Sequence, residues 1–308
     1  MPAKSLKGRN FISLADFSGD ELLFVLERAR RIKHDFRVGR LDVTLNGKCV
    51  ALIFMKPSTR TRVSFEAGVF YLGGHPLVLG GGELQIQRGE SWTDTGRVLA
   101  RYVDGIVIRT FAQSDVVELA QAGGKPVING LTDEEHPCQI VSDLLTIREK
   151  KGTLAGTKLC YVGDGNNVAN SLLLGCALAG LDIRYACPPG HEPDPGIVAK
   201  AQGLAHDTRV EGFADAAEAA SGADVIYTDV WTSMGQNEDK SKEKKFAAFQ
   251  VNSGLVGKAA PDVMVMHCLP AHRGKEITAD VIDGPRSAVW DQAENRLFGQ
   301  MAIMALIF

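Results

Sequence analysis

Short apolar runs alternate with amphipathic stretches along most of the chain. Runs of strand length occupy residues 48–54, 76–79, 105–109, 126–129, 158–162, 182–187, 224–228, 263–267 and 288–290. Helical spacing of apolar positions occupies residues 18–33, 59–72, 90–102, 113–122, 137–150 and a final stretch over 291–308. Strands that alternate with helices in this way predict βαβ units, in which helices cover both faces of parallel sheets.

The length of the chain adds a division into domains. The chain has 308 residues, which suits two domains of ordinary size. The long helix over 137–150 leads into Lys150-Lys151-Gly152, where we place a boundary. We therefore predict an α/β protein with two doubly wound parallel-sheet domains, 1–148 and 149–308, joined by interdomain helices. The last helix, about 291–308, is expected to return to the first domain, and the Gly-rich stretch 80–89 to form a mobile polar loop.

Composition and charge narrow the class of protein. The net charge of -3 disfavours a general nucleic-acid binder, which usually carries a basic excess. None of the six cysteines forms a C-x-x-C pair, and most lie in apolar runs, as expected of reduced thiols. The N-terminus has no apolar stretch typical of a secretory signal, and the apolar tail 301–308 is too short to span a membrane. These features predict a cytoplasmic protein that binds neither nucleic acid nor membrane.

The first cluster of candidate chemistry is Ser58-Thr59-Arg60-Thr61-Arg62, which follows the first apolar run and Pro57. Ser58 is a good N-cap, and the next backbone N–H groups have no partner within the helix. Their partial positive charge, the neighbouring hydroxyls and the Arg60 guanidinium together suit a phosphate group. Taken alone, the motif could also be a capped helix with two exposed arginines.

Two further features lie in the first half. His136-Pro137-Cys138-Gln139 begins a helix after an apolar run, and its His and Gln could both donate to one oxygen. Donors held in place in this way stabilise the charge that builds on a carbonyl oxygen during acyl transfer. Alone, the tetrad could be a surface His at a helix start, and Arg109 could be an ordinary arginine at a strand end.

The second half carries three polar turns, each after a predicted strand. Gly163-Asp164-Gly165-Asn166-Asn167 lacks the glycine that a dinucleotide fingerprint needs, because Val168 stands there. Asp229-Val230-Trp231-Thr232-Ser233-Met234-Gly235 could be a helix cap at the surface. His267-Cys268-Leu269-Pro270 ends a strand, and by residue type Cys268 could be a structural thiol or a nucleophile.

In order and spacing, these motifs resemble the aspartate and ornithine carbamoyltransferase superfamily, from about residue 10 to the C-terminus. F-M-K-P-S-T-R-T-R-x-S-F-E is similar to its carbamoyl phosphate motif, and the S-M-G element at 233–235 is typical of the ornithine branch. The resemblance implies transfer of a carbamoyl group from carbamoyl phosphate to the δ-amine of L-ornithine, which gives L-citrulline. It also implies a homotrimer or a multiple of trimers, with no metal or organic cofactor.

The resemblance also implies site residues. The implied carbamoyl phosphate ligands are Ser58, Thr59, Arg60, Thr61, Gln85, Arg109, His136, Pro137, Cys138, Gln139, Cys268, Leu269 and Arg296. Gln85 would reach the site of a neighbouring subunit, with Gln87 as the second choice. The implied ornithine ligands are Asn167, Asp229, Ser233 and Met234. Arg60, Arg109, His136 and Cys268 are the implied catalytic residues, with Cys268 and Asp229 helping to remove the proton of the amine.

Alternatives stay open at this stage. Within the same class, the acceptor could be putrescine or an acylated ornithine, although the S-M-G element disfavours both. A nicotinamide-dependent dehydrogenase would share the alternation of strands and helices, but Val168 argues against it. An amino acid-binding regulator would keep the pocket without needing Arg60, His136 and Cys268 together.

Overall fold

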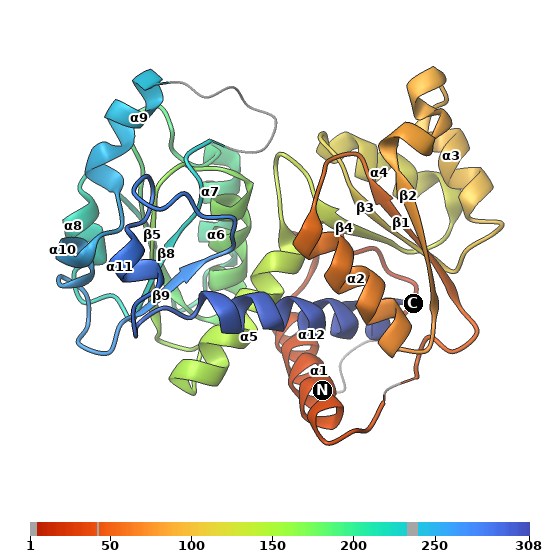
Figure 1. Cartoon of the computed structure of the whole chain (residues 1–308), viewed down its shortest axis with the longest axis horizontal. Helices are drawn as coiled ribbons and strands as arrows, with labels where there is room; N and C mark the ends of the chain where they lie inside the picture. The colour runs from red at the N-terminus through yellow and green to blue at the C-terminus, as the bar shows by residue number, and fades with distance from the viewer. Residues whose placement is uncertain (1–4, 42, 233–239) are drawn as a thin grey trace. The chain divides into compact units, whose positions relative to one another are not determined.

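The structure, a computed structural model, describes residues 5–41, 43–232 and 240–308. It divides into two compact units. The first is formed by Met1–Leu145 together with Asn295–Phe308, and the second by Thr146–Glu294. Each unit holds one parallel sheet with helices packed beside it, so the chain has the predicted α/β fold (Figure 1).

The sheet of the first unit has four parallel strands in the order β2-β1-β3-β4. Their bounds are β1 (Cys49–Phe54), β2 (His75–Gly80), β3 (Gly105–Arg109) and β4 (Val127–Leu131). Most of β1 and all of β3 are buried, as expected of central strands that are covered on both faces. The helices are α1 (Gly19–Arg37), α2 (Thr59–Tyr71), α3 (Trp92–Leu99), α4 (Gln113–Gly123) and the greater parts of α5 (Pro137–Lys151) and α12 (Val289–Ile307).

Helix α12 is the element that joins distant parts of the sequence within the first unit. It packs closely on α2, because a Cβ atom on Gly68 would lie 3.0 Å from Met304 Cε and 3.2 Å from Met301 Cγ. The absence of a side chain at Gly68 therefore allows the close approach. Although α12 is apolar along much of its length, none of the helices within the described residues is both long and apolar enough to cross a membrane.

The sheet of the second unit has five parallel strands in the order β7-β6-β5-β8-β9. Their bounds are β5 (Lys158–Val162), β6 (Asp182–Ala186), β7 (Val210–Phe213), β8 (Val225–Thr228) and β9 (Met264–His267). The helices are α6 (Asn167–Ala179), α7 (Pro195–Leu204), α8 (Ala216–Ala220), α9 (Lys240–Phe246), α10 (Ser253–Val256) and α11 (Ala279–Ile282). The strand order reverses beside β5, and the carboxyl ends of the strands at such a point are the usual place for a ligand.

The structure corrects one predicted element and adds others. The strand expected at 288–290 is wrong, because Val289 and Trp290 begin α12 and only Ser287 forms an isolated bridge to Val265. Strand β7 was not predicted. The stretch 80–89, predicted as a polar loop, contains two short 3-10 helices, η2 (Gly81–Glu83) and η3 (Gln85–Arg88). A third 3-10 helix, η1, spans Leu14–Asp16, and a fourth, η4, spans Ala247–Phe249.

Candidate functional site

The turn between β1 and α2 forms the first part of the site. Ser58 has extended backbone angles, and its Oγ accepts from the backbone N–H of Thr61 at 3.3 Å, as the sequence predicts for an N-cap. The turn is tied to the neighbouring strand, because Met55 N donates to the carbonyl of Arg109 at 2.9 Å. The first amides of α2 thus begin at the carboxyl end of the sheet, where the helix dipole favours an anion.

Thr61 is the centre of the polar contacts in the first unit. Its Oγ1 accepts from Arg296 Nη2 at 2.9 Å and lies 3.4 Å from Arg109 Nη1. Arg296 also donates through Nη1 to Gln139 Oε1 at 2.6 Å, and Gln139 Nε2 donates to Asp143 Oδ1 at 2.8 Å. All five side chains are buried. The fold therefore brings four of the predicted ligands together, although they come from α2, β3, α5 and α12.

His136 lies among the same positive charges. The pKa of His136 is held well below its ordinary value of 6.5, chiefly because the ring is buried and also because Arg296, Arg109 and Arg60 surround it with positive charge. The imidazole is therefore neutral at physiological pH, and a neutral imidazole can still donate one N–H group. A carbonyl oxygen with developing negative charge is a suitable acceptor.

The side chain of Cys138 faces the core. Its Sγ donates to the carbonyl of Asn129 at 3.2 Å, and burial raises the pKa of the thiol to about 12. The Cys138 thiol is therefore protonated at neutral pH.

Lys56 was not singled out from the sequence as a buried charge. It lies just before the Ser58 turn, pairs with Asp133 and places its Nζ atom 4.3 Å from the centre of the Phe111 ring. Asp133 belongs to the segment that leads to His136. The pair therefore links the segment before α2 to the segment before α5. A Lys that follows a strand and precedes Pro57 is the only sequence signal for this role.

Gln85, unlike the residues of this buried cluster, is exposed. It begins η3, and its side chain is exposed, as is that of Gln87. The backbone carbonyl of Gln85 accepts from Glu90 N at 3.2 Å, which closes the short helical turn.

In the second unit, the turn between β5 and α6 depends on two glycines, Gly163 for its positive φ and Gly165 for close approach. Gly163 has φ = 140°, and a Cβ atom on Gly165 would lie 2.2 Å from the backbone of Glu192 and Pro193. Asn166 then caps α6, because its Oδ1 accepts from Val168 N at 2.9 Å and from Ala169 N at 3.2 Å. Val168 is buried, so a packed side chain stands where a dinucleotide fingerprint would have glycine.

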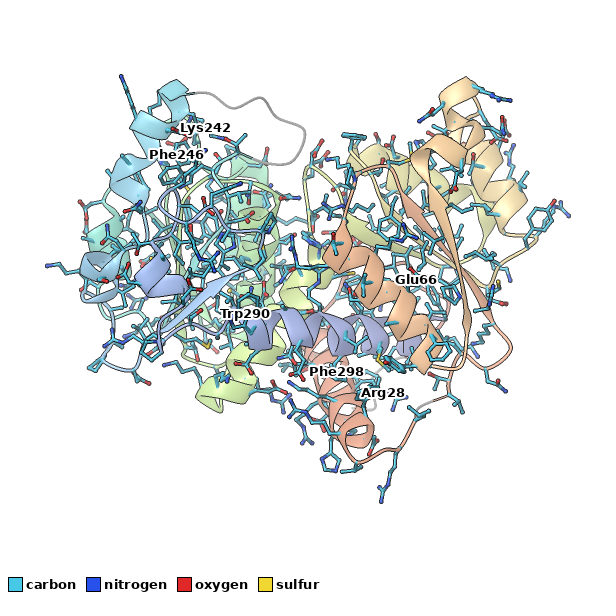
Figure 2. All side chains as sticks on the ribbon, in the orientation of Figure 1. Arg28, Glu66, Lys242, Phe246, Trp290 and Phe298 are labelled. Carbon is cyan, nitrogen blue, oxygen red and sulfur yellow. The ribbon has the colours of Figure 1, made fainter. Side chains whose placement is uncertain are left out.

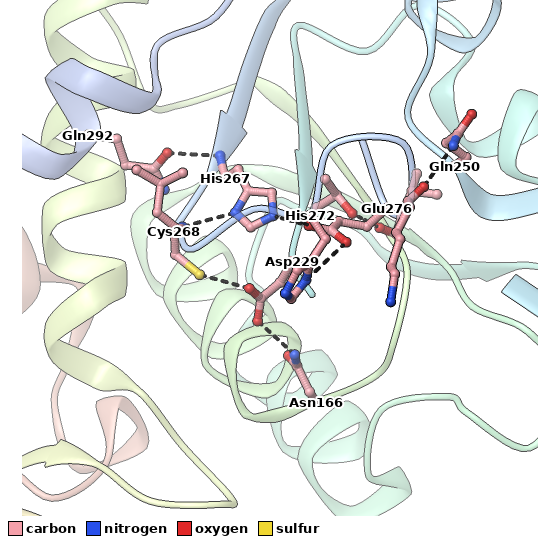
Figure 3. A network of polar contacts seen from close by, with 12 residues as sticks. Asn166, Asp229, Gln250, His267, Cys268, His272, Glu276 and Gln292 are labelled. Atoms are coloured by element: carbon pink, nitrogen blue, oxygen red, sulfur yellow. Dashed lines mark hydrogen bonds and ion pairs between the residues drawn. The ribbon is translucent and has the colours of Figure 1, made fainter. Parts of the chain in front are cut away.

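Asp229 is the centre of polar contacts in the second unit (Figure 3). Its Oδ1 accepts from Cys268 Sγ at 3.0 Å, and its Oδ2 accepts from Asn166 Nδ2 at 2.8 Å. Asp229 follows β8 and Cys268 follows β9, so parallel pairing of these strands brings the two side chains together. Asn167 begins α6 and is half-buried, whereas the predicted ligands Ser233 and Met234 lie outside the described residues.

Asn166 is a residue that the sequence interpretation missed. Its Oδ1 serves the helix cap while its Nδ2 holds Asp229. The neighbouring position, Asn167, was preferred on resemblance. A signal was available, because Asn directly before a helix that follows a strand is a strong N-cap candidate.

Asp164 anchors a second group of charges in the same unit. One carboxylate oxygen lies 3.2 Å from His191 Nδ1, and the other accepts from Lys242 Nζ at 2.9 Å. Lys242 also lies 5.2 Å from the centre of the Phe246 ring, and both come from α9 (Figure 2). Trp231 packs on the same ring at 5.5 Å. The turn after β5 is thus connected to α9 through one carboxylate.

Asp229, His267 and Cys268 also offer metal-ligand atoms within 4.8 Å of one another. His267 Nδ1, however, accepts from the Leu269 amide at 2.9 Å, and Nε2 lies 3.2 Å from Glu276 Oε1. A metal ion bound by His267 would have to displace Leu269 or Glu276 from the ring. A metal ion that left the ring in place would have only the Asp229 carboxylate and the Cys268 thiol as ligands from this group.

Comparisons with known proteins agree with this arrangement. Residues 9–149 match the family model of the aspartate/ornithine carbamoyltransferase carbamoyl-P binding domain, and residues 155–307 match that of the Asp/Orn binding domain. The ornithine carbamoyltransferase of Symbiobacterium thermophilum is 56% identical over 98% of this chain and 99% of its own. The anabolic ornithine carbamoyltransferase of Pyrococcus furiosus is 51% identical over 98% of this chain and 97% of its own.

Solved structures give the same result. The ornithine carbamoyltransferase structure from Pyrococcus furiosus matches with a TM-score of 0.96 at 50% identity, over 99% of this chain and 98% of that one. The structure from Gloeobacter violaceus matches with a TM-score of 0.88 at 48% identity, over 97% and 98%. With two family models that together cover nearly the whole sequence, the chain belongs to the aspartate/ornithine carbamoyltransferase family.

Proposed function

We propose that this protein is an ornithine carbamoyltransferase. It transfers the carbamoyl group of carbamoyl phosphate to the δ-amine of L-ornithine and releases L-citrulline and phosphate. The observation that carries the proposal is the buried meeting of Arg109 and Arg296 on Thr61, at the N-terminus of α2. Two buried guanidinium groups beside a helix N-terminus provide N–H donors that suit a phosphate or a polarised carbonyl. The names of the family models and of the relatives support the same reaction.

The first unit is proposed to bind the donor. The phosphate lies at the start of α2, where Arg60 neutralises its charge, while Thr61, Arg109 and His136 polarise the carbonyl oxygen. Because His136 is neutral, it donates to this oxygen without adding another positive charge. The full set of proposed donor ligands is Ser58, Thr59, Arg60, Thr61, Gln85, Arg109, His136, Pro137, Cys138, Gln139, Cys268, Leu269 and Arg296.

The second unit is proposed to bind the acceptor. Asp229 attracts the amino groups of ornithine, since its contacts with Cys268 and Asn166 come from uncharged donors and leave its negative charge in place. Asn167, Ser233 and Met234 complete the proposed ornithine ligands. Cys268 lies beside Asp229 and, with it, orients the amine and helps to remove its proton.

The chemistry needs the amine in its neutral form, because an ammonium group has no electron pair with which to attack. The δ-nitrogen forms a bond to the carbonyl carbon, and a tetrahedral intermediate results. The bond between this carbon and the phosphate oxygen then breaks, and phosphate leaves with the electron pair. Positioning of both substrates and stabilisation of the oxyanion supply most of the acceleration in this scheme.

The quaternary structure and location are also part of the proposal. We expect a homotrimer or a multiple of trimers in the cytoplasm. In this assembly the exposed Gln85 of η3 reaches the donor site of a neighbouring subunit.

The experiment that tests the function compares amine acceptors with the purified protein. We expect citrulline to form from carbamoyl phosphate and L-ornithine, with kcat/KM at least about a hundredfold above that for putrescine or an acylated ornithine, since unmet polar groups in a site penalise the wrong substrate strongly. Aspartate serves as the control for the other branch of the family. Preference for putrescine or an acylated ornithine would replace the proposed acceptor, and activity with none of these amines would refute the reaction.

A further inference from the structure

The turn Cys268-Leu269-Pro270, directly after β9, has a conformation that needs outside support. Leu269 has φ = 60°, in the left-handed region that a branched side chain adopts only at an energetic cost. Its backbone N–H donates to His267 Nδ1 at 2.9 Å. Because a strained backbone persists only where its surroundings hold it, the ring of His267 has a direct part in maintaining this turn.

His267 is itself fixed from three sides (Figure 3). The residue is fully buried, and its backbone N–H donates to Gln292 Oε1 at 2.9 Å. Its Nδ1 accepts from the Leu269 amide, and its Nε2 lies 3.2 Å from Glu276 Oε1. Since Nδ1 is an acceptor, the ring proton lies on Nε2 and is donated to Glu276.

Glu276 is held as an anionic acceptor. Its Oε1 also accepts from His272 N at 2.5 Å, and its backbone carbonyl accepts from Val251 N at 2.8 Å. Burial alone would raise the pKa of Glu276, but the hydrogen bonds from His267 and His272 outweigh burial and lower the pKa below its usual value of 4.5. An ionised carboxylate at this place selects the His267 tautomer that leaves Nδ1 free of a proton.

We propose that His267 and Glu276 are positioning residues for carbamoyl transfer, through the turn that carries Cys268 and Leu269. Glu276 fixes the tautomer of His267. His267 Nδ1 then fixes the Leu269 amide and, with it, the directions of the Leu269 carbonyl and of the Cys268 thiol, which lies 3.0 Å from Asp229 Oδ1. The inference rests on the proposed function, in which Cys268 and Leu269 contact the substrates. The competing view is that the buried pair only stabilises the fold.

Two variants of His267 separate these views. In His267→Asn, the amide oxygen takes the place of Nδ1 and can accept from the Leu269 N–H two residues on, but the contact with Glu276 is lost. In His267→Gln, the longer side chain can still donate to Glu276, but nothing replaces Nδ1. Each variant replaces the ring with an uncharged amide and breaks one of the two contacts.

We expect the rates of the two variants to differ. With ornithine, kcat should fall about a hundredfold in His267→Gln but only about tenfold in His267→Asn, because a small displacement of a group that orients the reacting atoms costs rates of this order. KM for carbamoyl phosphate should stay within about twofold in both, since its proposed phosphate ligands belong to the other unit. Steady-state kinetics measure both quantities, and thermal melting gives the stability of each variant.

The outcomes are distinct. Equal kcat in the two variants, or kcat that simply follows the melting temperature, would overturn the positioning role while citrulline formation by the wild type still supports the proposed function. A wild type that forms no citrulline would remove the function and this inference with it.

Variants of Glu276 give a test that does not depend on the folding of the His267 variants. Glu276→Gln keeps an acceptor oxygen for His267 Nε2 and for the His272 amide, so we expect kcat within about threefold of wild type. Glu276→Leu removes the acceptor and should lower kcat about tenfold at unchanged KM for carbamoyl phosphate. Wild-type kcat in Glu276→Leu would contradict the inference.

Discussion

Each unit has one residue on which its polar contacts converge, and the charged groups at these two places have opposite signs. In the first unit, the centre is the neutral hydroxyl of Thr61, and the groups around it are the guanidinium groups of Arg109 and Arg296. In the second unit, the centre is the carboxylate of Asp229, and its donors are the neutral amide of Asn166 and the thiol of Cys268. The first centre presents guanidinium N–H donors and the second presents a carboxylate, so the two suit ligands of opposite sign.

This difference shows why the net charge of the whole chain says little about its substrates. The chain carries -3 overall, yet burial and then the positive charge of three neighbouring arginines lower the pKa of His136. In the proposed reaction, the anionic donor brings a charge of opposite sign to the guanidinium groups of the first unit. In the proposed reaction, the carboxylate of Asp229 attracts the amine, and its neutral donors do not compete with the amine for it.

The largest expected effect comes from removing a positive charge from the first unit. In Arg60→Ala, we expect kcat/KM for carbamoyl phosphate to fall about a thousandfold, equivalent to about 4 kcal/mol, because a charge-assisted contact with the donor is lost. Steady-state kinetics and calorimetric binding of inorganic phosphate measure the effect.

Arg62→Ala is the matched control on the same turn of α2. The Arg62 side chain is 56% exposed and pairs with Glu66 at 3.5 Å, so its loss should change kcat/KM by no more than about twofold. Similar losses in both variants would mean that general positive charge, rather than Arg60, binds the donor.

A smaller effect is expected from removing a hydrogen bond that holds Asp229 in the second unit. Asn166→Ser keeps a good N-cap for α6 but removes the Nδ2 donor that holds Asp229. We expect kcat/KM for ornithine to fall by about tenfold to thirtyfold, as for a lost hydrogen bond to a charged group, while the melting temperature changes little. Phosphate binding by the first unit should be unchanged in calorimetry.

Asp194→Ser controls for the cap itself. Asp194 caps α7 with the same pattern, since its Oδ1 accepts from Gly196 N at 2.8 Å and from Ile197 N at 3.1 Å. Its replacement should leave the kinetics with ornithine at the wild-type level. Equal losses in Asn166→Ser and Asp194→Ser would assign the effect to helix capping instead of to Asp229.

The fold could be predicted where hydrophobic pattern alone decides the structure. The buried strands β3 and β5 lie where continuous apolar runs indicated, because a strand covered on both faces needs no polar alternation. Strand β7 was missed because Glu211 and Gly212 interrupt its apolar pattern, and its evidence is its pairing with β6. Residues 288–290 were misassigned because three apolar residues carry no periodicity that separates a strand from the start of a helix.

The site was predictable only in part for a similar reason. The Ser58 cap follows from local sequence, and the motifs placed polar residues at the ends of β3, β8 and β9. The contact between Asn166 and Asp229 joins residues 63 positions apart, and it depends on the pairing of β5 with β8. Glu276 has no local signal at all, since its importance arises from the ring of His267 that it meets in the core.

The smallest expected effect is on the pH dependence of folding stability, which should differ between the two units. The unfolded chain binds a proton on His136 near pH 6.5, whereas the folded protein binds it only at a lower pH, because burial and the arginines lower the pKa. As the pH falls below 6.5, the unfolded state therefore binds more protons, and the folded first unit loses up to about 1.4 kcal/mol per pH unit. His136→Gln should remove this dependence, measured by urea titration with hydrogen exchange of the β3 amides, in the absence of phosphate.

His206→Gln is the control, because His206 is exposed and its replacement should leave the pH slope of the wild type. An equal slope in wild type and His136→Gln would contradict the electrostatic account of the first unit.

Glu276 gives the second unit a different pH range of stability loss. Its pKa is lowered from 4.5, so its contribution to stability is complete above pH 4.5 and is lost as the pH falls through the lower, folded value. Mild acid should therefore loosen β3 of the first unit before it weakens β9 of the second. The stability that depends on His136 begins to fall below pH 6.5, where the unfolded chain takes up the proton, whereas the stability that depends on Glu276 begins to fall only below pH 4.5.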